Sequence, residues 1–446
     1  MNQKTTILLQ EQYDNLPYPQ IPIEQSPEEY YDTLFIHDLT TPYYLSQQKI
    51  IDTKDKVILD AGCGSGWTSL FLAYANPGAK IIGIDLSPKS VEVAKTRLNH
   101  HGFTNSEFYT LSIEDIDKLN YRFDYINCDE VIYLLPDAEK VLKLFQSLLN
   151  EQGIIRVNFH SYYQRFNFFR LQKLFKNMGL MDSNPDDLEV ELVKETFNSL
   201  NDSVAAKQLW KNKFASMAFP PQKQKQSILV NYLLQGDKGF TIPQVFEMLK
   251  SSHLSFLSMV MWRKWNIRDL FQNPDSLPDI WELGLGEVSQ EEELSLYELL
   301  NPIHRLIDFW CVNDNIQSSI NPVINWDKKD WETAKISLHP RLRYKKIKED
   351  LLKAIRTKQS FLFNRYISFP AKGNIDIESD IASCLIILWE KDSVTLEELV
   401  KRWLIIQPND LVSLQPKAME VAYDELINVI VRLENFLYIL VEKVGE

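Results

Sequence analysis

The stretch that most constrains the fold of this chain runs from Val57 to Asp85, with the sequence VILDAGCGSGWTSLFLAYANPGAKIIGID. A short apolar run ends at Asp60, three glycines follow at alternate positions, and an apolar segment of helical length comes next. A second apolar run, over residues 80–84, ends at Asp85. Apolar runs bounded by glycine turns in this way predict strand, loop, helix and strand. We therefore expect one βαβ unit with a carboxylate at the end of each strand.

The same alternation continues along the chain. Ser87 and Pro88 predict the cap and first residue of a helix that ends near Gly102. Further strands are expected at 107–111, 123–128, 153–159, 255–262 and 331–340, with helices between them. The pattern predicts an α/β fold, a doubly wound and mainly parallel seven-stranded sheet that binds ligands at the carboxyl ends of its strands.

Composition and pattern divide the 446 residues into five parts. The N-terminal part contains a proline-rich segment, YDNLPYPQIPI, and then a helix or helix pair that begins at Ser26 and ends near Gln48. The segment 294–311 is expected to be one helix. The five parts are residues 1–54, the βα core at 55–160, a helical insert at 161–240, the loop-rich completion of the sheet at 241–340, and a mostly helical, winged-helix-like domain at 341–446.

Charge and cysteine content exclude several classes of function. The formal net charge of −13 argues against binding energy that comes from neutralising phosphates, so nucleic acid is not an expected partner. The four cysteines show no CxxC pair, which predicts neither a zinc site nor disulfides and favours a reducing cytoplasm. His304 and Asp308 lack a second ligand pair, so no metal is expected. No apolar run approaches the ~18 residues needed to span a bilayer.

The glycine loop indicates the kind of ligand. Glycines let the backbone approach a ligand closely, and the N-terminus of the following helix favours an anion. Asp85 can accept hydrogen bonds from ribose hydroxyls. A dinucleotide also has these features, but its fingerprint G-x-G-x-x-G requires a glycine where Trp67 stands.

The pattern Asp60-x-Gly62-x-Gly64-x-Gly66, with Asp85 closing the next strand, closely resembles the class I S-adenosylmethionine-dependent methyltransferases. The resemblance covers about residues 55–160, including SIED at 112–115 and FDYINCDEVIYLLPD at 123–137. It implies S-adenosylmethionine as cofactor. It also implies that the glycines line the methionine and ribose, that Asp60 and Asp129 lie near the methionine ammonium, that Asp85 binds the ribose, and that Leu86, Ser112 and Ile113 contact the adenine. Ser112 stands where the family often has an aspartate, so Asp115 is an alternative adenine contact.

Methyl transfer is an in-line displacement, for which the enzyme mainly holds the acceptor in line with the methyl group. A general base is useful only when the acceptor must lose a proton. By position beyond the fourth and fifth strands, the catalytic candidates are Asp129, Tyr133 and His160, with Glu130 beside them. For Asp129 the alternatives are a turn cap or a contact to the cofactor ammonium. For His160 the alternative is a helix-capping or surface role.

The N-terminal tyrosines, Tyr13, Tyr18, Tyr30 and Tyr31, precede the first strand, where class I enzymes often fold a segment over the cofactor. The motif YDNLPYP also resembles the opening of some protein lysine methyltransferases that carry an extra regulatory domain. A lid and ordinary core packing are both open for these tyrosines. The whole layout resembles a bacterial group of methyltransferases with a helical insert and a C-terminal extension. The expected acceptor is a protein or peptide side chain; a small molecule, or a cofactor-binding scaffold without turnover, are the alternatives.

Overall fold

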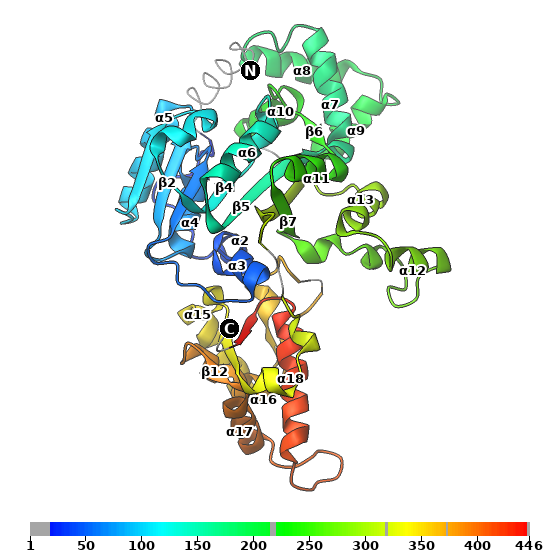
Figure 1. The fold of residues 1–446 in the computed structure, drawn as a ribbon. Helices are drawn as coiled ribbons and strands as arrows, with labels where there is room; N and C mark the ends of the chain where they lie inside the picture. The colour runs from blue at the N-terminus through cyan, green and yellow to red at the C-terminus, as the bar shows by residue number, and fades with distance from the viewer. Residues whose placement is uncertain (1–17, 215–219, 317–319, 372, 444–446) are drawn as a thin grey trace.

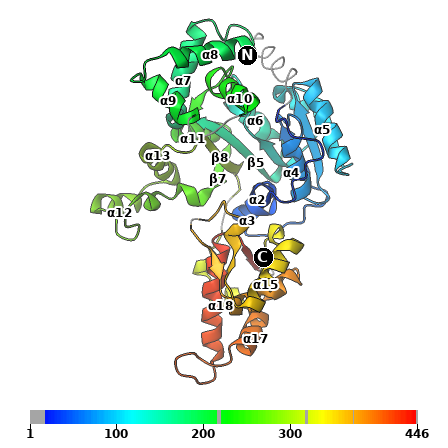
Figure 2. The ribbon, with the colours of Figure 1, turned by 180° about the vertical axis from the view of Figure 1, so that it is seen from behind.

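The computed structural model describes residues 18–214, 220–316, 320–371 and 373–443. A central α/β core carries a helical insert on one side and a C-terminal region on the other (Figure 1). The two short helices α2 (Tyr31–His37) and α3 (Thr40–Gln47) lie between the core and the C-terminal region in both views (Figures 1 and 2). The molecule is therefore elongated, with the core in its middle.

The core sheet has the strand order β3-β2-β1-β4-β5-β8-β7, and the short β6 also pairs with β5. All pairings from β3 to β5 are parallel, whereas β8 runs antiparallel to both of its neighbours. The predicted seven-stranded, mainly parallel sheet is thus confirmed, with the two-residue β6 as an additional strand. The strands are β1 (Val57–Ala61), β2 (Lys80–Asp85), β3 (Ser106–Thr110), β4 (Phe123–Cys128), β5 (Leu149–Ser161), β6 (Gly239–Phe240), β7 (Leu254–Met259) and β8 (Leu306–Asn313).

Helices cover both faces of the sheet and bury two large apolar cores. On one face, residues of α2 and α3 pack with α4 (Trp67–Ala75) and α5 (Pro88–His100). On the other face, α6 (Ala138–Leu148), α11 (Ile242–Ser251) and α13 (Gln290–Leu300) contribute their apolar sides. The short helix α12 (Asp279–Leu285) precedes α13. The carboxyl edge of the sheet is left for the loops that follow β1, β2, β4 and β5.

The insert consists of four helices with a small core of their own. They are α7 (Tyr162–Asn177), α8 (Asp187–Ser199), α9 (Ala205–Phe214) and α10 (Pro221–Tyr232). Phe175, Phe197, Trp210 and Tyr232 are the large residues buried between them. Because α7 begins directly after β5, the first turns of the insert lie at the carboxyl edge of the sheet.

The C-terminal region combines helices with small sheets. In the main sheet β9 (Ala334–Leu338) lies between β12 (Val394–Thr395) and β13 (Ile439–Lys443), and all pairings are antiparallel. The other elements are α14 (Lys328–Glu332), α15 (Lys345–Thr357), β10 (Phe361–Leu362), β11 (Asp376–Ile377), α16 (Ser379–Leu385), α17 (Leu396–Ile406) and α18 (Met419–Glu434). Its apolar core is continuous with the core beneath α2 and α3.

Polar contacts fasten the C-terminal region to the first helices. The Tyr44 hydroxyl donates to Val441 O at 3.0 Å and accepts from Val441 N at 3.0 Å. Arg341 Nε lies 2.7 Å from Asp38 Oδ2, and His339 Nε2 lies 3.1 Å from Thr41 Oγ1. These contacts are buried, so the C-terminal region and α2–α3 pack as one unit.

Three sequence-based expectations are wrong. The segment 294–311 is not one helix: α13 ends at Leu300, the chain turns around Pro302, and residues 306–313 form β8 between β5 and the edge strand β7. The strand expected over 331–340 exists as β9 but belongs to the C-terminal sheet. The helix expected to begin after Ser26 begins at Tyr31. By contrast, Ser87 caps α5 as predicted, with its side chain accepting from Ser90 N.

Candidate active site

The glycine loop joins β1 to α4 through three residues with left-handed backbone. Gly62, Gly64 and Gly66 have φ of 83°, 50° and 77°, conformations that favour glycine. A Cβ on Gly62 would lie 2.5 Å from Val131 Cγ2, and one on Gly66 would lie 2.7 Å from Ala94 Cα. The glycines therefore let the loop fit between the end of β4 and helix α5.

Asp85 closes the loop from the neighbouring strand. Its Oδ2 accepts from Gly64 N at 2.9 Å, and its Oδ1 accepts from Ser87 N at 2.9 Å. A carboxylate oxygen has two lone-pair directions, so each of these oxygens can accept a further donor. The half-buried carboxylate between the loop and the start of α5 thus fits a ligand with two adjacent hydroxyls, such as ribose.

Asp60 lies beneath the loop and is 2% exposed. Its two oxygens accept from Ser69 Oγ at 2.6 Å and from Asn127 Nδ2 at 2.9 Å. Burial raises the pKa of Asp60 to about 6, although both hydrogen bonds oppose the rise. In this structure Asp60 ties β1 to α4 and β4.

An N-terminal segment, residues 18–23, lies against the outer side of the loop. Tyr18 O accepts from Ser65 N at 2.9 Å, and a Cβ on Gly64 would come within 2.3 Å of the same carbonyl. Arg97, 1% exposed, donates to Ser65 O at 2.9 Å and to the carbonyls of Ile21 and Pro22 at 2.8 Å each. The segment is therefore held on the loop by backbone groups and one buried arginine.

The other N-terminal tyrosines have different surroundings. Tyr30 packs edge-on against Trp67 and Phe71 of α4. Tyr31 packs edge-on against Tyr344 and Tyr366 of the C-terminal region. Tyr13 lies outside the described residues. Tyr31 is therefore packed against the C-terminal region, whereas Tyr30 is 46% exposed on the surface of α4; Tyr18 lies beside the loop.

The residues expected at the adenine lie on the next two loops. Leu86 is half-buried directly after Asp85. Ser112 begins the short helix at 113–119, where its hydroxyl accepts from Glu114 N at 3.3 Å, and Ile113 is 6% exposed. Asp115 instead pairs with Lys118 at 2.7 Å, with both side chains exposed. The arrangement leaves Leu86 and the 111–113 backbone beside the end of β3.

Asp129 and Glu130 follow β4 at the carboxyl edge. Asn158 bridges them, because its Nδ2 donates to Asp129 Oδ1 and its Oδ1 accepts from Glu130 N at 2.8 Å. Glu130 has φ of 57°, an uncommon conformation for a residue with a side chain. Burial raises the pKa of Asp129, but Arg156 and His37 outweigh this and hold it below the usual value. Asp129 is therefore a carboxylate at neutral pH.

Arg305, just before β8, covers Glu130. Its Nη1 and Nη2 donate to the two oxygens of Glu130, at 2.7 and 2.5 Å, in a bidentate pair whose side chains are each 42% exposed. The same Nη1 donates to His160 Nε2 at 3.0 Å. Sequence reasoning missed Arg305, because its segment was expected to be a helix.

His160 is 1% exposed and both ring nitrogens are engaged. Since the arginine can only donate to Nε2, the ring proton is on Nδ1, which donates to Asp237 Oδ1 at 2.6 Å. Burial lowers the pKa of His160, against the opposing effect of Asp237. The ring of Tyr133, 3% exposed, stacks on the imidazole at 3.7 Å. His160 is thus a neutral, enclosed imidazole.

A buried polar row crosses the sheet below this edge. Asp60 pairs in register with Asn127, and Asn127 with Arg156. The Arg156 guanidinium, in a side chain 4% exposed, donates to Asn127 Oδ1 at 3.2 Å and to Asp308. In the sequence, the arginine inside the apolar run IIRVNF was the feature that could have predicted this buried polar row. This row of buried polar side chains lies beneath Asp129, and its Arg156 is 3.7 Å from the Asp129 carboxylate.

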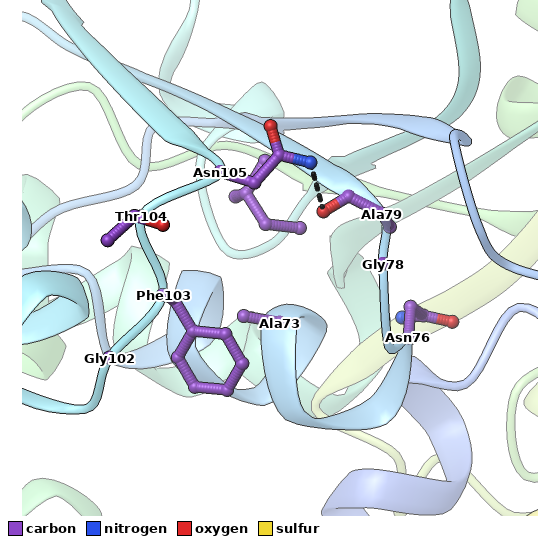
Figure 3. A pocket seen from close by; sticks show the side chains of 9 residues that line it. Ala73, Asn76, Gly78, Ala79, Gly102, Phe103, Thr104 and Asn105 are labelled. Atoms are coloured by element: carbon purple, nitrogen blue, oxygen red, sulfur yellow. Dashed lines mark hydrogen bonds between the residues drawn. The ribbon is translucent and has the colours of Figure 1, made fainter.

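A separate cavity of about 150 Å³ lies at the opposite edge of the sheet. Figure 3 shows it between the end of α4, residues 76–79 and residues 102–105. The polar side chains in its wall are Asn76, Thr104 and Asn105, and Asn76 is engaged by Leu39 N at 2.9 Å and His37 O at 2.8 Å. This wall has no titratable group to perform chemistry.

Comparison with known proteins identifies the part of the chain that contains the carboxyl edge. A family model described as a methyltransferase domain matches residues 52–225, which include the glycine loop, Asp85 and Asp129. This part of the chain is a methyltransferase domain. This methyltransferase uses S-adenosylmethionine, and the loop and Asp85 described above fit that group.

Relatives of the methyltransferase differ in how much of it they cover. An uncharacterized protein of Synechococcus is 24% identical over 71% of this chain and 73% of its own length. A ubiquinone biosynthesis O-methyltransferase of Coxiella burnetii is 34% identical over 27% of this chain and 51% of its own length. The structure of PKMT2 from Rickettsia typhi in complex with AdoHcy has a TM-score of 0.60 and 18% identity, and the match covers 96% of this chain and 78% of that one. The fold likeness thus extends through the insert and the C-terminal region.

Other features bear on the expectations about compartment and metal. All four cysteines are free and buried. Within the described ranges, no helix is both long and apolar enough to cross a membrane. No group of three His, Cys, Asp or Glu side chains suited to a metal occurs in the same part of the chain.

Proposed function

We propose that the acceptor of the methyl group is an amine on a protein or peptide side chain. The observation that carries this proposal is the pairing of carboxylates and exposed aromatic rings at the carboxyl edge. Asp129 and Glu130 offer negative charge, and Tyr162, Tyr163 and Phe166 at the start of α7 are 40–48% exposed. Carboxylates suit an ammonium and aromatic faces suit its alkyl chain.

The residues of the site then have separable roles. S-adenosylmethionine, when bound, would supply the methyl group of its sulfonium. The acceptor ammonium would first lose a proton to water, and the neutral amine would then attack the methyl group in line as the methyl–sulfur bond breaks. Asp85 holds the ribose, with the glycine loop beneath it, and residues 18–23 act as a lid on the loop. Asp129 orients the acceptor electrostatically, because a carboxylate with a lowered pKa is a weak base. His160 and Tyr133 position Arg305 and are not proton carriers in this proposal.

A small-molecule acceptor is the second candidate. It is favoured by the 34% identity to the ubiquinone biosynthesis O-methyltransferase, which is confined to 27% of the chain. The likeness to PKMT2 instead includes the insert and C-terminal region, and these add surface that a small acceptor does not need. The proposal retains the divisions at residues 54, 160 and 240, a cytoplasmic location and no nucleic-acid acceptor. It begins the C-terminal region at α14 rather than after residue 340, because β9 belongs to the C-terminal sheet.

The test supplies the purified protein with S-adenosylmethionine labelled in its methyl group and with fractionated bacterial extract. We expect label in protein, at lysine, and calorimetric binding of AdoHcy by the protein alone. Asp129→Asn should lower labelling by at least about tenfold, since a charged interaction contributes about 1.5–3 kcal/mol. The matched control is Asp137→Asn at the cap of α6. Label only in small molecules selects the second candidate, and binding without any labelling indicates a scaffold.

A further inference from the structure

Lys213, in the last turn of α9, lies where the insert meets the carboxyl edge. Its Nζ is 4.5 Å from the centroid of the Phe168 ring, and the Arg165 guanidinium is 5.2 Å from the centroid of the same ring. Arg165 is 1% exposed, whereas Lys213 is half-buried and reaches solvent. Two cations thus share one aromatic ring.

The charges around Lys213 do not balance. Arg165 pairs with Asp237 at 2.7 Å, and Arg305 pairs with Glu130. No described carboxylate forms a hydrogen bond or ion pair with Lys213, and the sequence ASMAF at 215–219 contains no acid. Burial, Arg165 and Arg305 together lower the pKa of Lys213 to about 8. An unpaired, half-buried ammonium is unfavourable unless an anion joins it.

A series of side-chain contacts connects Lys213 to the proposed acceptor carboxylates. From Lys213 they pass over Phe168 to Arg165 and Asp237, and from there through His160 and Arg305 to Glu130. The exposed rings of Tyr162 and Phe166 belong to the same helix as Phe168. At one end of this wall Glu130 is paired with Arg305, and at the other end Lys213 has no described carboxylate beside it.

We propose that Lys213 is the anchor of a second acceptor subsite, which binds a carboxylate near the side chain that is methylated. This inference rests on the proposed peptide acceptor and specifies its class: a segment with an acidic residue close to the methylated amine. Arg165 and Arg305 add to the positive potential while their own partners hold them in place. The subsite selects the acceptor and takes no part in bond breaking.

The first test uses the wild-type protein and needs no turnover. Acylation of individual lysines is followed by mass spectrometry with N-acetylglutamate α-amide as the probe anion and N-acetylglutamine α-amide as its uncharged match. The glutamate probe should slow acylation of Lys213 by up to about fivefold, as expected for an ion pair near the surface. Lys211, on the same helix and paired with Asp202 at 2.7 Å, is the internal control. Equal acylation of Lys213 with both probes overturns the inference.

The second test compares lysine peptides that carry Glu, Gln or Arg beside the acceptor. The wild-type enzyme should prefer Glu through a lower KM, and Lys213→Glu should move the preference to Arg while Lys211→Glu leaves it unchanged. Peptides that are labelled without preference overturn the inference. Protection of Lys213 together with no labelling of any peptide supports the anion subsite and contradicts the proposed acceptor, so the two failures are distinguishable.

Discussion

Arg156 and Asp308 face each other across β5 and β8, with Nε and Nη2 of the guanidinium 3.2 and 2.8 Å from the two carboxylate oxygens. Arg156 also lies 3.7 Å from Asp129, so one buried cation serves two carboxylates. The pair belongs to the buried polar row beneath Asp129, and the charge of Arg156 keeps Asp129 ionised.

Asp308→Asn should therefore destabilise the fold. The substitution leaves Arg156 only the more distant Asp129 as a charged partner, and breaking a buried pair costs up to about 3–5 kcal/mol. Urea unfolding of the variant measures this loss. Glu397→Gln is the control, because it removes the exposed pair with Lys401 and should cost under about 1 kcal/mol. Equal losses of unfolding free energy in the two variants would show that the fold does not depend on the buried pair of Arg156 and Asp308.

Asp85→Ala should weaken cofactor binding. The carboxylate is expected to accept the ribose hydroxyls, and a hydrogen bond to a charged group contributes about 1.5–3 kcal/mol, so affinity should fall by at least about tenfold. Titration calorimetry with AdoHcy measures it, and Glu92→Gln on the exposed side of α5 is the control. An unchanged affinity would remove Asp85 from the cofactor site.

Arg97→Ala should release residues 18–23 from the glycine loop. The substitution removes the donors to Ser65, Ile21 and Pro22 but leaves the bond from Ser65 N to Tyr18 O. Hydrogen exchange at Ser65 N–H should then be faster by at least about tenfold, since three charged hydrogen bonds are lost. Lys89→Gln, exposed on the same helix, should leave this rate unchanged. Unaltered exchange in Arg97→Ala would mean that other contacts hold the segment.

The buried His339 should make stability depend on pH. Burial lowers its pKa to about 4, and its ring packs on Phe35 at 4.6 Å. In the unfolded chain its pKa is about 6.5, so between pH 6.5 and pH 4 only the unfolded state binds the proton. The unfolding free energy should fall by about 3 kcal/mol for this residue as the pH decreases across that window.

Urea unfolding at several pH values checks this expectation. His339→Gln should make the decline shallower by that amount, even though it lowers stability at pH 7. His253→Gln, whose side chain is 76% exposed, should leave the slope unchanged. A wild-type slope in His339→Gln would assign the acid sensitivity to other groups.

Local sequence signals predicted the parts of the fold whose conformation is determined by neighbouring residues. The loop glycines, Asp85 and the caps at Ser87, Thr241 and Thr395 are found where their residue types indicate. Here the physical cause is local: a left-handed backbone or an unpaired helix N–H needs a particular side chain.

The errors occurred where distant partners decide the structure. Residues 306–313 have one charged side chain in an apolar run, which fits a helix or a strand equally well by pattern. Arg156, 152 positions away, and Asn158 stabilise the Asp308 carboxylate inside the sheet. Arg305 and Lys213 were missed for the same reason, since their importance comes from Glu130, Arg165 and Phe168 and not from any motif.

The hydrogen bonds of Tyr44 with Val441 have a consequence for synthesis of the enzyme. The two residues are 397 positions apart, and Tyr44 belongs to the helix pair that packs against the catalytic core. On the ribosome, the partner strand β13 is therefore translated about 400 residues after that helix pair. Packing of the pair is completed only once β13 has emerged, and a product terminated before β13 lacks the strand that secures the pair.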